Sequence, residues 1–264
     1  MLRFGGGYQG SSFTELLSTE FPHLRPEFSR LAPGEPGVAV PHGTTVLAMR
    51  YADGVLVAGD RLATEGYRVA SRDVQKVYPT DEFSLIAIAG AAGPSIEMAR
   101  LMRIELEHYE KIEGEPLELD GKANKLSQMV RANLPAAMQG LVVVPLFAGY
   151  DQRRGLGRLW KFDVTGGRYE ETDYDSTGSG GVYARESLKK SHRADLTRDE
   201  ALDVAVEALV DAADEDRGTG GIDVVRRIFP NVTFCSAEGL DEASDETIEA
   251  AYRRVSQPRA GRPA

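Results

Sequence analysis

A threonine directly after a glycine stands where the leading segment of this chain gives way to its first strand-forming run. The residues are His42-Gly43-Thr44-Thr45, followed by Val46-Leu47-Ala48. If the Gly43–Thr44 bond is cut, Thr44 gains a free α-amine, so one residue carries both a nucleophilic hydroxyl and a base. The reference pKa of that amine is about 7.7–8.0, so much of it is neutral near physiological pH. The pair predicts acyl-transfer chemistry, although Gly-Thr taken alone more often just starts a strand.

Such a nucleophile needs a cation beside it and a carboxylate to hold that cation. Lys76 lies in Val74-Gln75-Lys76-Val77-Tyr78, a run that predicts an apolar strand, and only seven of the 31 basic residues are lysines. Asp60 follows the predicted strand Val55–Gly59 and is available to pair with Lys76. The alternative is a solvent-facing lysine and an aspartate that makes a local turn bond.

The nucleophile also needs N–H donors for the oxyanion of the reaction. The segment Ala89-Gly90-Ala91-Ala92-Gly93 lies between a predicted buried strand and a predicted helix. Its small side chains allow a ligand backbone to approach free N–H groups. The alternative is a tight turn from strand to helix.

The elements that must position these residues are strands, two helices, strands, two helices and strands. This order predicts antiparallel sheets with helices packed outside them, an α+β fold, because alternating βαβ units are absent. The strands are expected over residues 44–50, 55–60, 69–78, 83–89, 141–150, 158–164, 168–173, 222–229 and 232–236, and the helices over 94–113, 123–134, 182–190, 197–216 and 242–255.

Local signals support several of these helices. Met98, Met102, Leu106 and Tyr109 recur at helical spacing and predict one buried face. Thr197 and Glu200 form a capping-box pattern at the start of the helix over 197–216. Pro135 is expected to kink or end the helix over 123–134.

Residues 1–43 differ from the rest of the chain. They contain five of its 13 prolines and seven glycines without an apolar period, so they are expected to remain unfolded. Met1-Leu2-Arg3-Phe4 leads into glycines rather than an apolar core, which excludes a secretory signal. A formal charge of −10 argues against a nucleic-acid surface, and the chain has no long uncharged apolar run that predicts a membrane span.

Two further features carry no separate activity. Cys235 is the only cysteine, which fits a reducing cytoplasm, and its expected role is that of a small buried hydrophobe. The loop Gly178-Ser179-Gly180 lacks the Gly-Lys-Ser/Thr ending of a phosphate-binding loop, so nucleotide binding is not expected.

From Thr44 to about Val255 the chain resembles the proteasome β subunits, closest to the bacterial (actinobacterial) type, which are N-terminal-nucleophile hydrolases. The motifs that carry the resemblance occur in order along the chain: His42-Gly43-Thr44-Thr45, Ala58-Gly59-Asp60-Arg61-Leu62-Ala63-Thr64, Val74-Gln75-Lys76-Val77-Tyr78, Ala89-Gly90-Ala91-Ala92-Gly93, Gly178-Ser179-Gly180-Gly181 and Asp214-Glu215-Asp216-Arg217-Gly218-Thr219-Gly220-Gly221. The resemblance implies a four-layer αββα sandwich of two antiparallel sheets flanked by helices. It also implies a propeptide over 1–43, a hydrolase domain over 44–256 and a disordered tail over 257–264.

The resemblance implies a role for each matched residue. Thr44 corresponds to the catalytic nucleophile, freed by autocatalytic cleavage after Gly43, and Asp60 and Lys76 to the pair that tunes it. The remaining assignments are Ser179, Asp216 and Thr219 around the threonine amine, Gly90 as oxyanion donor, and Ala63, Thr64, Val74, Ile88 and Ala92 in substrate binding. Many family members have serine where Thr219 stands, but threonine keeps the hydroxyl. No metal or cofactor is implied.

The implied function is a threonine endopeptidase that cuts unfolded proteins inside a closed chamber of the cytoplasm. Its apolar pocket predicts cleavage after apolar residues. The implied partners are further copies in a heptameric β ring, proteasome α-subunit rings, a ring ATPase activator and tagged protein substrates.

Two alternatives remain at this point. One is a catalytically silent ring subunit, although such a subunit has no need to keep Thr44, Asp60 and Lys76 together. The other is the two-ring bacterial protease that also begins Thr-Thr. That family is shorter and has a very short leader, whereas this chain has a long leader and an Asp-x-x-Thr-Gly-Gly ending at 216–221.

Overall fold

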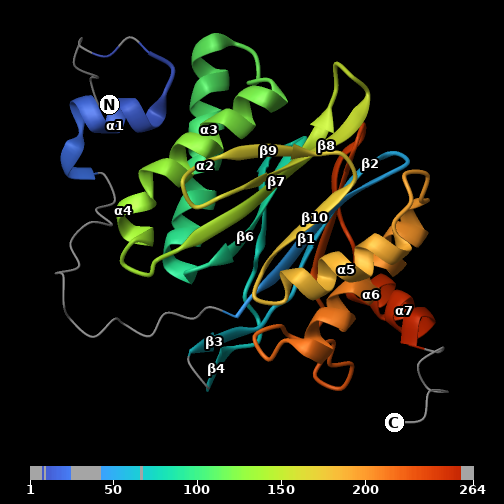
Figure 1. The fold of residues 1–264 in the computed structure, drawn as a ribbon. Coiled ribbons are helices and arrows are strands. Elements are labelled where there is room, and N and C mark those ends of the chain that lie inside the picture. The colour runs from blue at the N-terminus through green and yellow to red at the C-terminus, as the bar shows by residue number, and fades with distance from the viewer. Residues whose placement is uncertain (1–7, 9, 25–42, 66–67, 257–264) are drawn as a thin grey trace.

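Two five-stranded antiparallel sheets lie face to face, and helices cover their outer faces (Figure 1). This computed structural model describes residues 8, 10–24, 43–65 and 68–256. His42, most of the expected propeptide and the tail over 257–264 lie outside the described residues. The α+β class and the four-layer αββα arrangement predicted from the sequence are confirmed.

The first sheet begins at the candidate nucleophile. Its strands pair in the order β10-β1-β2-β11-β12, and all the pairs are antiparallel. Their bounds are β1 Thr45–Tyr51, β2 Gly54–Gly59, β10 Tyr174–Gly178, β11 Asn231–Ser236 and β12 Gly239–Glu242.

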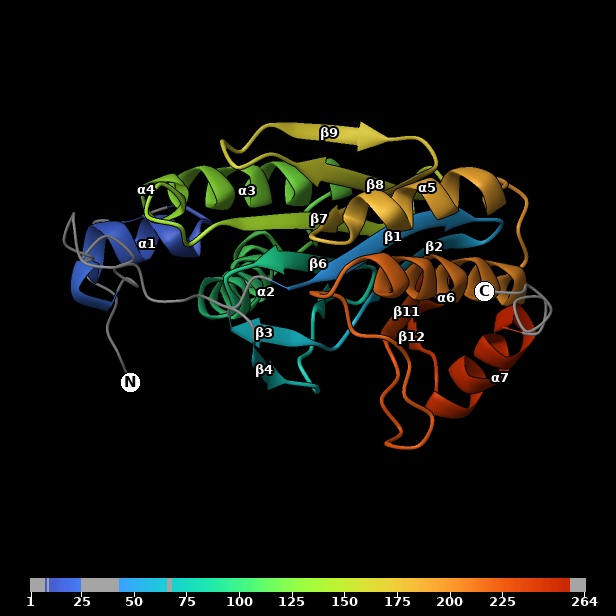
Figure 2. The same cartoon turned by 60° about the horizontal axis from the view of Figure 1, so that its bottom comes forward.

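The second sheet pairs in the order β5-β6-β7-β8-β9. Its strands are β5 Val77–Asp81, β6 Ser84–Gly90, β7 Val143–Asp151, β8 Leu156–Phe162 and β9 Arg168–Glu171. A separate hairpin of β3 (Ala63–Glu65) and β4 (Arg68–Ser71) stands apart from both sheets (Figure 2).

The helices form the two outer layers. The second sheet is covered by α2 (Ala92–Glu113) and α3 (Leu119–Ala132), with the short α4 (Leu134–Ala137) beyond them. The first sheet is covered by α5 (Gly181–Ser191), α6 (Arg198–Glu215) and α7 (Asp245–Ser256). Among the described residues, no helix is long and apolar enough to cross a membrane.

Burial on both faces explains why the central strands are apolar at almost every position. In β1, Val46 and Ala48 face the second sheet, whereas Leu47 and Met49 face the helices of the first layer. Successive strand side chains point to opposite faces, so a strand between two apolar layers needs an apolar residue at each step. The same inner layer buries Cys235, and burial raises the pKa of its thiol to about 12. The predicted core role of this cysteine is confirmed.

The predicted helix signals are confirmed with small shifts. Thr197 and Glu200 form the capping box of α6. Helix α2 begins at Ala92, two residues before Pro94, and Gly114 closes it with a left-handed φ of 80°. Pro135 follows the end of α3, where the chain passes into the short α4.

Several of the element predictions are wrong. Residues 222–229 form a loop with one isolated bridge between Asp223 and Ile228 instead of a strand, and the extended piece over 69–78 is interrupted at 72–76. Strands β10 and β12 were not predicted, because β10 lies in a Gly- and Ser-rich segment and β12 is short and acidic.

A further error concerns the leader. Residues 13–20 form helix α1 (Phe13–Glu20), and Pro22–Leu24 form a 3₁₀ turn. Helix α1 contacts α2, and its Leu16 is buried. No apolar period marks this short helix, because Leu16 is its one buried residue and polar contacts such as that of Thr14 hold it in place.

Candidate active site

Thr44 lies at the point where β1 enters the first sheet between β2 and β10. Its carbonyl oxygen accepts a hydrogen bond from the Ser179 N–H at 2.8 Å, just after β10 ends. The side-chain hydroxyl donates to the Gly43 carbonyl oxygen at 2.6 Å, and Thr44 is 5% exposed. The chain is continuous here, so the Thr44 nitrogen is a peptide amide that stands in for the amine of a cut chain.

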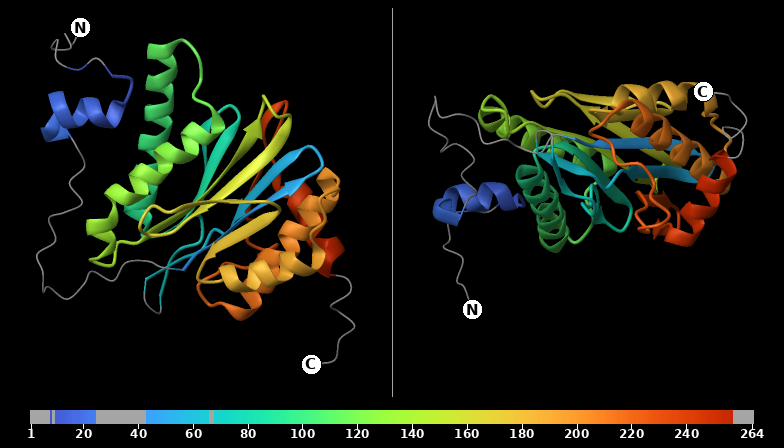
Figure 3. Two further views of the ribbon diagram at one scale, coloured as in Figure 1. Left: turned by 45° about the horizontal axis from the view of Figure 1, so that its top comes forward. Right: turned by 90° about the horizontal axis from the view of Figure 1, so that it is seen from below.

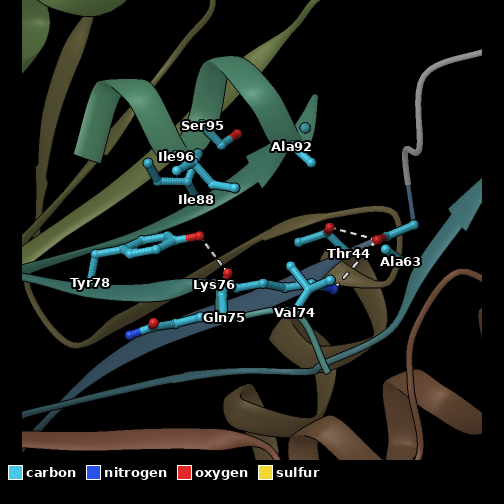
Figure 4. Close-up of a pocket in the computed structure, with 12 residues that line it drawn as sticks. Thr44, Ala63, Val74, Gln75, Lys76, Tyr78, Ile88, Ala92, Ser95 and Ile96 are labelled. Carbon is cyan, nitrogen blue, oxygen red and sulfur yellow. Dashed lines mark hydrogen bonds between the residues drawn. The ribbon is translucent and has the colours of Figure 1, made fainter. Parts of the chain in front are cut away.

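The sequence predicted that Lys76 lies inside a strand. In the structure it lies just before β5, which begins at Val77. Its ammonium donates to Asp60 Oδ1 at 2.6 Å and to the Leu62 carbonyl at 2.6 Å. A third, longer bond of 3.4 Å runs to the Gly43 carbonyl oxygen, the same atom that the Thr44 hydroxyl contacts (Figure 4). The three protons of the ammonium are therefore all directed at acceptors.

Burial lowers the pKa of Lys76 below its ordinary 10.5, and the negative charge of Asp60 offsets part of this effect. Lys76 is 4% exposed and Asp60 is 1% exposed. A buried charge is stable only when it is paired and hydrogen-bonded. The pair therefore fixes one positive charge beside Gly43 and Thr44.

Asp60 is held in turn by three backbone N–H groups. Oδ1 accepts from Thr45 at 2.7 Å, and Oδ2 accepts from Leu62 at 2.9 Å and from Gly220 at 2.8 Å. These donors come from β1, from the segment between β2 and β3, and from the loop after α6. The carboxylate thus fixes three segments of the chain around Lys76.

A second acidic group lies on the nitrogen side of Thr44. Asp216 Oδ2 accepts from the Ser179 hydroxyl at 2.5 Å and from the Thr219 hydroxyl at 2.7 Å. Ser179 Oγ in turn accepts from the Thr44 N–H at 3.3 Å. Burial raises the pKa of Asp216, but the hydrogen bonds from Ser179, Thr219 and Gly218 outweigh it, so the net shift is downward. The Thr44 nitrogen is therefore linked through one hydroxyl to a carboxylate.

Gly90 lines the pocket in front of Thr44 at the end of β6. Its φ of +126° lies in the region that favours glycine, and a Cβ there would come within 2.0 Å of the Val142 carbonyl oxygen. Only glycine fits this backbone. The backbone of this residue is therefore fixed beside the nucleophile.

The pocket in front of Thr44 is open to solvent and has a cavity volume of about 20 Å³ (Figure 4). Of the predicted substrate residues, Ala63, Val74, Ile88 and Ala92 all line it. Thr64 is not among the lining residues; its hydroxyl lies against Gly43, where a Cβ would come within 2.5 Å of it. The remaining lining residues are Gly43, Thr44, Gln75, Lys76, Tyr78, Gly90, Ser95 and Ile96.

Sequence reasoning missed Gln75, Tyr78, Ser95 and Ile96 as pocket residues. Ser95 and Ile96 lie three and four residues after Ala92 on α2, a spacing that puts them on the same helix face. That spacing was the available signal for these two. Tyr78 is turned toward the pocket and donates its hydroxyl to the Gln75 carbonyl. The bend that allows this bond has no marker in the sequence.

The arrangement brings together a candidate nucleophilic hydroxyl, a fixed cation, a polar group at the Thr44 nitrogen and a pocket with several apolar side chains. Among the described residues, no group of three or more His, Cys, Asp or Glu side chains is placed to hold a metal ion.

Comparison with known proteins gives consistent matches over most of the chain. A family model described as "Proteasome subunit" matches residues 40–226. A protein named proteasome subunit beta from Streptomyces griseus subsp. griseus is 51% identical over 253 residues, which cover 96% of this chain and 90% of that protein. Proteins with the same name from Stackebrandtia nassauensis and Frankia casuarinae are 50% and 51% identical; the alignments cover 96% and 90% of this chain and 92% and 87% of those proteins.

Proposed function

This chain belongs to the proteasome subunit family, and we propose that it is the catalytic β subunit of a 20S proteasome, a threonine endopeptidase with Thr44 as its nucleophile. The observation that carries the proposal is the convergence on one atom. The Thr44 hydroxyl and the Lys76 ammonium both contact the Gly43 carbonyl oxygen, and buried Asp60 holds the lysine.

The first reaction is removal of the leader. The Thr44 oxygen attacks the Gly43 carbonyl carbon, the C–N bond to Thr44 breaks, and the freed nitrogen takes the proton. Water then hydrolyses the resulting ester, which releases residues 1–43. The contact of the Lys76 ammonium to the Gly43 carbonyl oxygen polarises this bond. The mature unit is residues 44–256, followed by the tail over 257–264.

The mature enzyme uses the same groups on other peptides. The Thr44 hydroxyl attacks the scissile carbonyl, and its own amine accepts the proton through a water molecule. The positive charge of Lys76 favours the neutral amine by like-charge repulsion. Ser179, Asp216 and Thr219 orient the amine, and the Gly90 N–H stabilises the oxyanion. The leaving amine takes the proton, and water releases the acyl group.

The substrate lies as an added strand against the backbone of Thr64 and Ala92. The residue before the cut enters the pocket lined by Ala63, Val74 and Ile88. Of the pocket side chains, only Lys76 is charged, and its ammonium is fully engaged. This supports cleavage after apolar residues.

We infer the assembly from the family. Proteasome β subunits assemble with α subunits into particles. For this chain we propose heptameric β rings stacked between α rings in the cytoplasm, served by a ring ATPase that delivers tagged, unfolded proteins.

The test is the variant Thr44→Ala in particles assembled with the α partner. Short fluorogenic peptides with apolar, basic or acidic residues before the cut report the activity. We expect wild-type particles to cleave fastest after apolar residues and Thr44→Ala to lose at least about 10³-fold in kcat/KM, because the nucleophile is gone. Retained activity in the variant would remove Thr44 from the mechanism, and faster cleavage after acidic residues would contradict the pocket assignment.

A further inference from the structure

The leader contacts the body of the protein at a second place besides the Gly43–Thr44 bond. Helix α1 lies outside both sheets, with one end against α2 (Figure 3). It has only 8 residues. Isolated helices shorter than about 12–15 residues are marginal in water, so docking on the body must stabilise this helix.

The principal contact is a buried carboxylate on α2. Glu105 is 1% exposed, although it lies in a helix whose neighbouring positions build the apolar core. Its Oε2 accepts from the Thr14 N–H at 2.7 Å and from the Thr14 hydroxyl at 3.1 Å. Thr14 is in the first turn of α1, whose free N–H groups carry the positive end of the helix dipole. The carboxylate therefore caps the leader helix.

Two neighbouring groups complete the contact. Lys125 on α3 lies 2.6 Å from Glu105 Oε1 and also donates to Ser12 Oγ at 3.0 Å. The Phe13 ring meets the His108 ring edge-on, with centroids 5.9 Å apart. Ser12 is the N-cap of α1, so the body contacts the cap residue and the first two residues of the helix. A buried anion needs such partners, and the leader supplies two of its donors.

We propose that this face of α2 and α3, formed by Glu105, His108 and Lys125, is a binding site for the first turn of the leader helix. The site goes beyond the proposed catalysis, because it recognises the leader far from the cut bond. Glu105 lies 13 residues after the pocket residue Ala92 on the same helix, about 20 Å along its axis. The leader is thus held by a covalent bond at Gly43 and by a charged cap at Glu105.

The experiment uses the full-length chain with Thr44→Ala, in which the leader stays attached whether or not the proposed cleavage is correct. Amide hydrogen exchange over residues 13–20 reports the docked helix. Adding Thr14→Glu sets a second carboxylate against Glu105, while the change is favourable for an isolated helix because it places an acid in the first turn. We expect at least tenfold faster exchange over residues 13–20. The control is Ser18→Glu, which adds the same charge at an exposed position of α1 and is expected to change exchange less than threefold.

A rescue separates a specific contact from general repulsion. Adding Glu105→Gln to Thr14→Glu removes the opposing charge and is expected to restore most of the protection. Glu107→Gln, at an exposed position of the same helix, is expected to restore none. Slow exchange of the β6 amides checks that the body of the protein stays folded in each variant. If Glu105→Gln unfolds the body, the comparison of Thr14→Glu with Ser18→Glu alone tests the proposal. The proposal is overturned if residues 13–20 exchange at unfolded rates in the parent chain, or if Thr14→Glu and Ser18→Glu behave alike.

Discussion

At the scale of single residues, Asp60 is the group on which the site depends most. It accepts four hydrogen bonds, three from backbone N–H groups and one from Lys76. The fold alone determines where these backbone N–H groups lie. They hold the carboxylate in place, and the carboxylate in turn holds the Lys76 ammonium. The lysine then fixes the charge beside Thr44.

Asp60→Asn tests this dependence. The amide keeps the shape of the side chain but places an NH₂ group against donors and leaves the Lys76 charge buried without a counter-ion. Breaking a buried pair in this way costs about 3–5 kcal/mol. We expect a loss of that size in the free energy of unfolding, measured in urea, and a loss of peptidase activity. The control is Asp73→Asn, whose carboxylate is 78% exposed and whose effect should stay within about 0.5 kcal/mol. An Asp60→Asn protein as stable as wild type would contradict this role.

The lowered pKa of Lys76 predicts an alkaline limb in the activity profile. The proposed mechanism needs the charged lysine, and burial moves its pKa below the ordinary 10.5. The value of kcat/KM should therefore begin to fall as the pH rises through the folded-state pKa, before 10.5 is reached. Stability responds in the opposite direction: between the two pKa values the unfolded chain binds the additional proton, so this group favours folding more as the pH rises. A kcat/KM that stays constant up to pH 10.5 in intact particles would contradict the proposed requirement for a charged Lys76.

Composition singled out Lys76 and Asp60 as candidates, but the resemblance to a known family, carried by six ordered motifs, was needed to favour a catalytic pair over a solvent-facing lysine and a turn aspartate. Lys76 is conspicuous as a lysine in an apolar run, and Asp60 ends an apolar strand. The backbone donors of Leu62 and Gly220 could not be found in this way, because every residue except proline has an N–H group and only the fold selects these two. Tyr78 and Gln75 were missed for the same reason.

At the scale of elements, burial pattern decided which predictions succeeded. Strands β1, β2, β6 and β7 are apolar on both faces and long enough to recognise. The loop over 222–229 has a similar composition, but Val225 is 94% exposed and Arg227 has a left-handed φ of 53°. Apolar content alone cannot distinguish a buried strand from a loop that buries some apolar residues, such as Phe229, and exposes others.

The junction between the leader and β1 predicts a strict requirement for glycine. A Cβ on residue 43 would lie 2.5 Å from the Gly218 carbonyl oxygen and 2.5 Å from the Thr64 hydroxyl. Gly43→Ala must therefore shift the scissile carbonyl away from Lys76 and the Thr44 hydroxyl. A misplacement of about 1 Å can cost about 10²-fold in rate, so we expect leader removal to slow by about that factor. The measurement is the fraction of cut chain against time in denaturing gels.

The matched control for this junction is Gly93→Ala on α2. A Cβ at that position meets no atom within 4 Å, so leader removal should proceed at the wild-type rate. Equal processing of Gly43→Ala and wild type would show that the junction tolerates a side chain, against the steric argument.

At the scale of the whole molecule, the proposed cleavage site between Gly43 and Thr44 is enclosed by the fold. Gly43 is buried and Thr44 is only 5% exposed. A separate protease needs an exposed segment that it can bind, so burial of this bond favours the proposed self-cleavage over cleavage by another enzyme. The two sheets cover each other and are covered by helices outside, so further subunits can contact only helices, loops and strand edges.

We therefore expect leader removal to be intramolecular and to accompany assembly. In particles formed with the α partner, the intact mass of this chain should fall by the mass of residues 1–43, and electron microscopy should show four stacked rings of seven subunits.

When wild-type and Thr44→Ala chains are mixed in one particle, each wild-type chain should lose its leader and each variant chain should keep it, because a neighbour cannot reach the buried bond. Cleavage of the variant chains by their wild-type neighbours would refute self-cleavage, and active particles that still begin at Met1 would refute the free amine of Thr44 as the base.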